Sequence, residues 1–342
     1  MTPLDMAPPA AAEIHTLAED LVWFRFTLPF RLNHINLYAL RTTSGWLLLD
    51  CGINSDDTAA QWTPILAHLT ATAPIIGIII SHYHADHIGY AGHLACLTNA
   101  PIMMGQIEYD RASLILSQSD SLSGQIAADA YHDFGFEPAM VARKRDEGNY
   151  YRTLVGDLPE VQIIDAGHVF DTVAGRWEVR FDAGHSPGHM SLTDHHRHLY
   201  IGVDFLLPRI SPNVSVGLYA PDEDVLAAYL SYLQSMTELA NDWLVLPGHD
   251  WPFYGGGVRA QSLIAHHESR LCQLLEANQP LTTKQAIENL FPFTLTDHEL
   301  HFASGEARAH LNHLGTRGAM IRSRQGGATI FTPAHDESGQ LT

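Results

Sequence analysis

Cysteine and basic residues are scarce in this chain of 342 residues. The 3 cysteines, Cys51, Cys96 and Cys272, are odd in number and far apart, so we expect no disulfide framework and predict a reducing, cytoplasmic location. Lys+Arg number 19 against 38 Asp+Glu, which gives a formal net charge of −19. Because such an acidic surface repels phosphate groups, nucleic acids and anionic membranes are disfavoured as partners.

Long apolar runs are also missing. No run approaches the roughly 18 residues that a membrane span needs. Residues 1–12 contain no Lys or Arg and are interrupted by prolines, so we do not expect a signal peptide. Hydrophobic residues still make up 46% of the chain, which excludes a disordered protein and leaves enough apolar surface for one large core or two domains.

Strand and helix patterns alternate along the chain, which predicts an α/β protein. The expected strands are 21–28, 35–41, 46–50, 74–80, 101–104, 161–164, 177–182, 199–203 and 243–246, and the expected helices are 54–72, 88–97 and 223–239. Residues 105–158 form a mostly helical, polar insertion between these elements. Two interpretations of the insertion stay open, a solvated helical hairpin and a lid over a site.

The end of the chain has a different pattern. Three helices are expected at 258–278, 282–290 and 305–315, followed by a hairpin of 320–323 and 329–332. Helices followed by a hairpin favour a winged-helix-like domain over 257–342, behind a larger domain over 1–256 that holds the predicted sheet strands. Residues 255–342 carry 7 Lys+Arg against 8 Asp+Glu, so a docking or homodimer role is favoured over nucleic-acid binding.

Histidine is abundant, with 22 residues, more than Lys and Arg together. The densest group is His82-Tyr83-His84-Ala85-Asp86-His87, which directly follows the apolar run 74–80. Such a run is typical of a strand buried on both faces, and open sheets hold ligands where these strands end. Burying so many imidazole and carboxylate groups without a cation would be costly, so the motif predicts a site for Zn²⁺, Fe or Mn.

Three more candidate ligands follow in order, each where a predicted strand ends. They are His185 in Gly184-His185-Ser186-Pro187-Gly188-His189, Asp204 after 199–203, and His249 in Pro247-Gly248-His249. Glycine before His185 and before His249 lets the backbone turn sharply at the strand end. Each residue alone would be weak evidence for a metal site.

Taken together, these motifs resemble the five-motif signature of the metallo-β-lactamase superfamily over roughly residues 20–250. The resemblance implies a four-layer αβ/βα sandwich with two divalent metal ions at its rim, of which Zn²⁺ is the preferred identity. It also implies that His82, His84 and His185 hold one ion, that Asp86, His87 and His249 hold the second, and that Asp204 bridges both.

Two further resemblances refine this expectation. The doubled histidine of residues 184–189 resembles hydroxyacylglutathione hydrolases, in which the first histidine is the ligand. We therefore assign His185, while a shifted register would make His189 the ligand. The stretches 306–314 and 318–321 resemble the winged-helix domain found behind some β-lactamase-like hydrolases.

The expected activity is hydrolysis by a hydroxide that bridges the two ions, without a protein nucleophile. A metal can lower the pKa of bound water from 15.7 to about 7, and a second ion can stabilise the oxyanion. Asp86 and Asp204 are the candidate catalytic residues, because Asp86 could orient the hydroxide and Asp204 bridges the ions. Tyr83, Arg209 and Asn213 are candidate substrate contacts, Arg209 as a clamp for a carboxylate or phosphate.

The preferred substrate is a small-molecule thioester or other acyl ester. A lactonase and a ribonuclease of the same superfamily are alternatives, although the net charge argues against RNA. A mononuclear iron dioxygenase uses a related frame and predicts one iron rather than two ions. A metal-stabilised scaffold without catalytic activity is the remaining alternative, and the intact ligand motifs argue against it.

Overall fold

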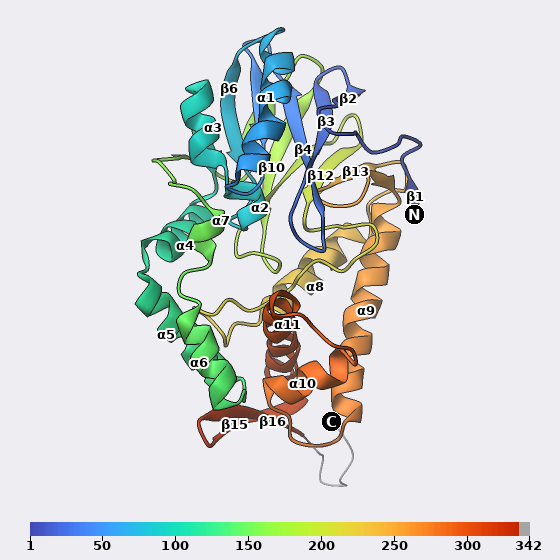
Figure 1. Cartoon of the computed structure of the whole chain (residues 1–342). Coiled ribbons are helices and arrows are strands. Elements are labelled where there is room, and N and C mark those ends of the chain that lie inside the picture. Colours follow the sequence, from blue (N-terminus) through green and yellow to red (C-terminus); the bar gives the residue numbers. More distant parts are fainter. Residues whose placement is uncertain (335–342) are drawn as a thin grey trace.

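Two seven-stranded sheets form the centre of the molecule (Figure 1). The computed structural model describes residues 1–334. The first sheet has the order β2 (His15–Ala18), β3 (Leu21–Thr27), β4 (His34–Arg41), β5 (Trp46–Leu49), β6 (Ile75–Ile80), β7 (Ile102–Met104), β8 (Gln162–Ile163). The second has the order β1 (Thr2–Pro3), β14 (Phe253–Tyr254), β13 (Leu244–Pro247), β12 (Leu199–Val203), β11 (His189–Asp194), β10 (Arg176–Asp182), β9 (Val169–Asp171).

Burial on both faces explains why the strands are so apolar. In β3, Leu21 and Trp23 belong to the cluster between the two sheets, while Val22 and Phe24 belong to the cluster beneath the helices of the first sheet. Helices α1 (Asp56–Thr70) and α3 (Ala91–Thr98) supply buried side chains to that outer cluster. Helix α8 (Val225–Met236) packs on the outer face of the second sheet, which completes the expected helix–sheet–sheet–helix layering.

The expected strands of the catalytic part are present, with small shifts at their ends. Among the described residues, five strands of the two sheets were not predicted, namely β1, β2, β9, β11 and β14. Of these, β11 is buried at all six positions although its sequence, HMSLTD, mixes polar and apolar residues. The helix expected over 88–97 is divided into α2 (Ala85–Ile88) and α3. A side chain at Gly89, between them, would lie within 2.6 Å of three backbone atoms, so the chain turns here in close contact with its neighbours.

The insertion is helical, as predicted. It consists of α4 (Gln106–Ser117), α5 (Asp120–Asp133), α6 (Pro138–Asp146) and α7 (Tyr151–Leu154). Figure 1 shows α4 and α7 beside the sandwich, with α5 and α6 extending away toward the C-terminal hairpin.

The C-terminal part contains α9 (Gly256–Glu276), α10 (Thr283–Leu290) and α11 (Asp297–Thr316), followed by a hairpin of β15 (Met320–Gln325) and β16 (Ala328–Pro333). Helix α11 begins earlier than predicted because Thr296 and Glu299 form a capping box. These helices share one hydrophobic cluster with α5 and α8, so their core is continuous with that of the sandwich. The boundary at 256/257 stays a prediction, and residues 335–342 of the predicted C-terminal domain lie outside the described residues.

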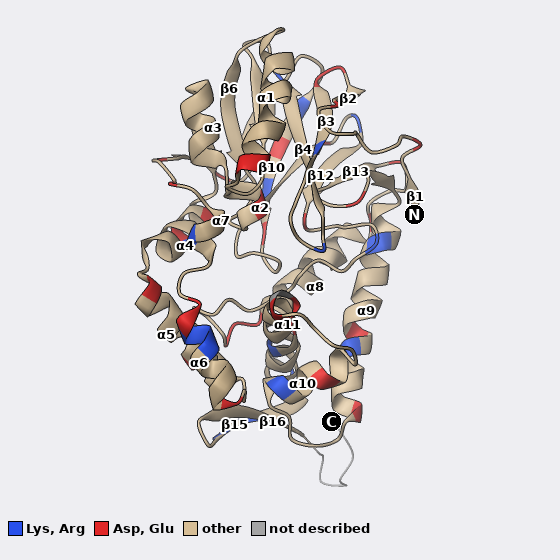
Figure 2. Cartoon of the chain, viewed as in Figure 1, with Lys and Arg blue, Asp and Glu red and all other residues tan. Residues whose placement is uncertain are grey.

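Charge is spread thinly over these elements. Figure 2 shows basic and acidic positions interspersed along α9 and α10. Within residues 1–334, none of the helices has the length and apolarity that crossing a bilayer requires.

Candidate metal centre

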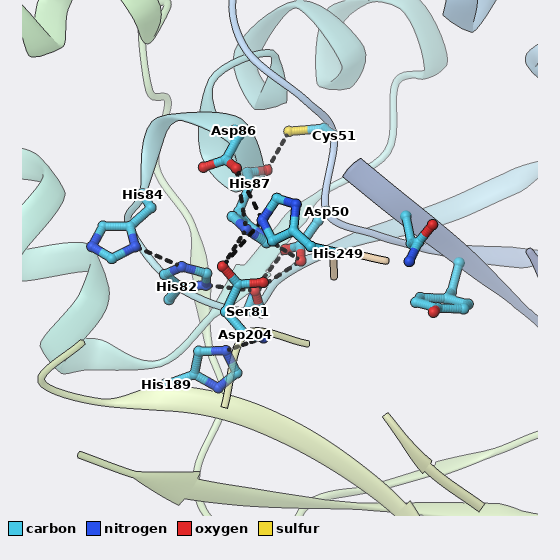
Figure 3. A network of polar contacts seen from close by, with 12 residues as sticks. Asp50, Cys51, Ser81, His82, His84, Asp86, His87, His189, Asp204 and His249 are labelled. Carbon is cyan, nitrogen blue, oxygen red and sulfur yellow. Dashed lines mark hydrogen bonds and ion pairs between the residues drawn. The ribbon is translucent and has the colours of Figure 1, made fainter. Parts of the chain in front are cut away.

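The predicted ligands meet where four central strands end. Strands β5 and β6 are parallel neighbours in one sheet, and β12 and β13 are parallel neighbours in the other. Because parallel strands end at the same edge of a sheet, the residues that follow them converge. His82 follows β6, Asp204 follows β12 and His249 follows β13, while His185 lies in the turn between β10 and β11. Figure 3 shows most of these side chains pointing toward one centre.

One group of ligand atoms comes from three histidines. The distances are 3.0 Å between His82 Nε2 and His84 Nδ1, 3.0 Å between His84 Nδ1 and His185 Nε2, and 3.2 Å between His185 Nε2 and His82 Nε2. The three nitrogens therefore form a small triangle that faces a common point.

The hydrogen bonds behind these rings fix which nitrogen carries the proton. Ser81 Oγ donates to Asp50 Oδ2 at 2.8 Å, so it accepts from His82 Nδ1 at 2.9 Å. His185 Nδ1 donates to the carbonyl oxygen of Asn213 at 2.8 Å. Both Nε2 atoms therefore present lone pairs to each other at 3.2 Å, an electrostatically unfavourable contact that a cation would relieve.

A second group joins Asp86, His87 and His249. His249 Nε2 lies 3.4 Å from Asp86 Oδ2, and His87 Nε2 lies 3.7 Å from the same oxygen. Their Nδ1 atoms are engaged elsewhere, in His249 with the carbonyl oxygen of His34 and in His87 with Asp50, both at 2.8 Å. Both Nε2 atoms are thus directed toward the carboxylates.

Asp204 lies between the two groups. Its Oδ2 is 3.5 Å from His185 Nε2, 3.4 Å from His87 Nε2 and 3.3 Å from His249 Nε2. A Cβ atom at Gly248 would come within 2.3 Å of Asp204 Oδ1, so only glycine leaves room for this carboxylate. Asp204 Oδ1 and His87 Nε2 are buried without a hydrogen-bond partner among the described residues.

Electrostatics separate the two groups. Burial and the neighbouring His185 lower the pKa of His84 to about 3, and burial with the surrounding imidazoles lowers the pKa of His82 as well. In the second group burial also lowers the pKa of His249, but the negative charges of Asp204 and Asp86 outweigh it and raise that pKa to about 10. The first group is therefore a set of neutral imidazoles that can donate lone pairs to a cation. In the second group a protonated imidazole offsets the negative charge of the carboxylates, and a bound cation would displace that proton.

This arrangement fits divalent metal ions. Nitrogen ligands about 2.0–2.1 Å from Zn²⁺ at tetrahedral angles lie about 3.3–3.4 Å apart, close to the spacing of these donors. The ligand atoms of three sets of three residues lie within 4.8 Å of one another, namely His82–His84–His185, His82–His87–Asp204 and Asp86–His87–His249. Imidazole and carboxylate donors suit Zn²⁺, Fe and Mn, and the geometry does not select among them.

Asp50 is an important residue that the sequence did not reveal. It follows β5, is 1% exposed and has a φ of 61°. It accepts hydrogen bonds from the Ser81 backbone nitrogen and hydroxyl and from His87 Nδ1, each at 2.8 Å (Figure 3). Asp50 thereby orients one histidine of each group, and its position after an apolar strand, like that of Asp204, was the available signal.

His189 takes a different position from His185. It begins β11, and its Nε2 accepts a hydrogen bond from the Asp204 backbone nitrogen at 3.4 Å. The structure therefore brings His185, and not His189, into the triangle with His82 and His84.

Glu108 of α4 is a second residue that the sequence did not reveal. Its fully buried carboxylate accepts hydrogen bonds from the Tyr83 backbone nitrogen at 2.9 Å, from Ser186 Oγ at 2.7 Å and from the Gly188 backbone nitrogen at 2.6 Å. Tyr151 of α7 donates to the Tyr83 carbonyl oxygen at 2.5 Å. The insertion thus holds both histidine loops, which favours the interpretation that α4 and α7 cover the site.

The three predicted substrate contacts have different surroundings. The Tyr83 ring lies 4.7 Å from the His84 ring. Asn213 accepts a hydrogen bond from His185 Nδ1 at its backbone carbonyl oxygen. Arg209 pairs with Asp250 Oδ1 at 2.5 Å and stacks over Trp251, so an ion pair in the loop already occupies its guanidinium. Their role in substrate binding stays a prediction.

Comparisons with known proteins agree with this geometry. The family model described as "Metallo-beta-lactamase superfamily" matches residues 31–249, and that described as "Metallo-beta-lactamase-like, C-terminal domain" matches residues 270–334. A solved beta-lactamase domain protein from Burkholderia ambifaria is 33% identical, with a TM-score of 0.89 over 97% of this chain and 98% of its own. A metallo-beta-lactamase family protein from Thermus thermophilus is 23% identical, with a TM-score of 0.78 over 93% of this chain and 100% of its own, and shares the fold.

Among curated proteins, none matches this chain. The family model matches most of the chain, and the Burkholderia protein is 33% identical over nearly the whole of both chains, which together assign the family. The chain belongs to the metallo-beta-lactamase superfamily, whose members are metal-dependent hydrolases.

Proposed function

We propose that this protein is a dinuclear metal-dependent hydrolase that acts on a thioester or another acyl ester. The single observation behind the dinuclear proposal is the position of Asp204 Oδ2, within 3.5 Å of ligand nitrogens from both groups. In the proposed site His82, His84 and His185 hold one ion, Asp86, His87 and His249 hold the other, and Asp204 bridges them.

The chemistry divides between the ions and the chain. When bound, two divalent ions would supply a hydroxide at neutral pH and an electrophile for the carbonyl oxygen. The chain orients the ligands, since Asp50 and the carbonyl oxygens of His34 and Asn213 hold the imidazoles by their outer nitrogens. Asp86 is 22% exposed at its side chain, so it can accept a hydrogen bond from a group bound near the reacting centre.

The acyl substrate is supported by two features of the chain. The sequence of residues 184–189 has the doubled histidine of hydroxyacylglutathione hydrolases. The insertion places α4 against the histidine loops, where it can cover an acyl chain. Tyr83, Arg209 and Asn213 are the proposed substrate contacts.

Metal analysis and a substrate panel test the proposal. We expect about two ions per chain and hydrolysis of at least one member of a panel of acyl thioesters, acyl esters, lactones, β-lactams and RNA. Asp204→Ala should lose metal and lower the rate by at least about 100-fold, because the shared ligand is removed. Asp242→Ala, an exposed carboxylate paired with His198, is the matched control and should change neither.

Two results would contradict the proposal. One iron per chain together with oxygen uptake would indicate the dioxygenase instead. Full metal content and full rate in Asp204→Ala would refute the assignment of the bridge.

We also propose that residues 257–342 form a winged-helix-like domain with a docking or homodimer role. The order of three helices and a hairpin supports this class, and the near balance of charge disfavours nucleic acid. A cytoplasmic location rests on the three free cysteines. Sedimentation of the whole chain tests the homodimer, and a monomer at micromolar concentration would contradict it.

A further inference from the structure

Arg111 is a cation beside the candidate metal centre, near enough to Glu108 and Tyr83 to interact with both electrostatically. It lies on α4, is half-buried, and makes no hydrogen bond or ion pair with any residue of the described range 1–334. A guanidinium carries five donors, so leaving them without an acceptor in a half-buried position is costly. The protein has a net charge of −19, which makes a guanidinium that forms no ion pair within residues 1–334 notable.

The position of Arg111 is fixed by its neighbour on the helix, Glu108. One turn earlier, the carboxylate of Glu108 accepts hydrogen bonds from the Tyr83 and Gly188 backbone and from Ser186. It attracts Arg111 electrostatically, but within residues 1–334 no hydrogen bond joins the two side chains. These bonds hold α4 directly against the loops that carry His84 and His185. The backbone of Arg111 is therefore about 5 Å along the helix from Glu108, which holds the two histidine loops.

The guanidinium points across the gap to the loop that follows Asp204. Its Nη1 lies 3.4 Å from the place that a Cβ atom would take on Gly217. It is also close enough to interact electrostatically with the phenol of Tyr83, which lies between two of the proposed ligands. The side chain of Arg111 thus extends from the insertion to the loop 205–220 and lies near the first histidine motif.

Apolar side chains flank Arg111 on the same face of α4. Ile107 and Leu114 are four residues before and three residues after it, so the three share one helix face. Both are unusually exposed for their type, 57% for Ile107 and 43% for Leu114. Ile107 is 3.0 Å from the place of a Cβ atom on Gly188, next to the turn that carries His185.

We propose that Arg111 binds an oxyanion group, a carboxylate or phosphate, of the substrate while an apolar part of the same molecule lies on Ile107. This inference rests on the hydrolase function proposed above and narrows its substrate to an anionic acyl ester or thioester. Arg111 acts as a specificity-determining residue, and the reacting bond is left to the metal centre. The forked donors of a guanidinium suit a carboxylate and a phosphate equally well. The test therefore distinguishes a charge on the acyl side of the substrate from a charge on its leaving group.

Three thioesters test the proposal with the metal-loaded protein. Butyryl and succinyl thioesters of one neutral thiol differ by a carboxylate on the acyl side. A butyryl thioester of a phosphate-bearing thiol places the charge on the leaving side. We expect the wild type to prefer one of the two charged substrates. Arg111→Gln should lower kcat/KM for that substrate about 10- to 100-fold, and should change kcat/KM for the uncharged butyryl thioester by less than about 2-fold. Arg111→Lys should retain part of the preference.

Arg145→Gln, an exposed position on α6, is the matched control and should behave as the wild type. An equal loss on all three substrates in Arg111→Gln would show a merely structural role and overturn the proposal. Absence of any charge preference in the wild type would overturn it as well, while leaving the hydrolase function intact.

If the metal-loaded wild type hydrolyses none of the three, the hydrolase proposal fails for this class and binding decides the role of Arg111. The probes are then unreactive thioether analogues that bear a terminal carboxylate or a terminal amide. We expect the wild type to bind the carboxylate at least about 10-fold more tightly and Arg111→Gln to lose that difference. Equal affinities in the wild type would overturn the proposal.

Discussion

His185 and His189 illustrate how one turn assigns different tasks to the same residue type. His185 donates from Nδ1 to Asn213 and presents Nε2 to the other ligands, whereas His189 uses Nε2 to accept from the Asp204 backbone. We therefore expect His185→Gln to lose an ion and His189→Gln to keep about two per chain, measured by metal analysis after dialysis. If His189→Gln loses an ion and His185→Gln does not, then His189 is the ligand and His185 is not.

The ligands could be predicted from the sequence because they carry chemistry in their residue type and crowd at strand ends. Asp50 and Glu108 could not be predicted in these roles, since an isolated carboxylate after a strand or in a helix gives no sign of the donors that it meets in the fold. Only the folded chain shows that Asp50 holds Ser81 and His87, and that Glu108 holds two loops separated by about a hundred residues.

At the scale of elements, periodicity was enough where a strand or helix is uniformly apolar or amphipathic. The apolar run that became β6 was predicted because both of its faces are buried. Strand β11 was missed because Ser191 and Thr193 interrupt its apolar pattern, although both are buried. It pairs antiparallel with β10 and β12, its neighbours in the sequence, so its place in the sheet depends on burial that its mixed composition does not reveal.

The two sheets are joined at the edge of the sandwich by Asp20, in the turn between β2 and β3. Its carboxylate is fully buried and accepts from Arg197 Nη1 at 2.5 Å, from Arg197 Nη2 at 2.9 Å, from Thr172 Oγ1 at 2.5 Å and from Trp177 Nε1 at 3.1 Å. Burial opposes ionisation, but these donors hold the pKa of Asp20 below its usual value. Asp20→Asn should therefore lower the free energy of unfolding at pH 7 by about 3 kcal/mol.

The pH dependence of this difference has a definite sign. Because the pKa is lower in the folded state, the stabilisation is present above the unfolded value of about 3.9 and is lost as the pH falls through the folded value. Urea unfolding at pH 7, 4.5 and 2.5 should show the difference in unfolding free energy between wild type and Asp20→Asn narrowing at the lowest pH. Asp171→Asn, an exposed partner of Arg176, is the control and should differ little from the wild type throughout. A constant gap across this range would contradict the assignment.

At the scale of the whole molecule, Arg308 joins parts of the chain that are far apart in sequence. It lies on α11 with no exposed surface, and donates to Asp133 of α5 at 2.7 Å, to Asp222 at 3.1 Å and to Thr283 of α10 at 3.3 Å. The insertion, the loop after Asp204 and the C-terminal helices thus meet at one guanidinium, inside the hydrophobic cluster that they share. This integration was not expected from a sequence pattern that suggested a separate C-terminal domain.

Arg308→Ala should therefore weaken the whole molecule and not only its C-terminal part. Removing one member of a buried charge network typically costs about 3–5 kcal/mol, because the remaining carboxylates keep their desolvation cost without the full compensation. Urea unfolding monitored by circular dichroism measures the loss, and we expect one transition at lower urea. Arg322→Ala removes a half-exposed guanidinium that also pairs with Asp222, so this control should cost about 1 kcal/mol or less. If Arg308→Ala instead unfolds in two steps, with the metal retained through the first, then the C-terminal helices fold independently of the sandwich and the shared cluster does not couple them.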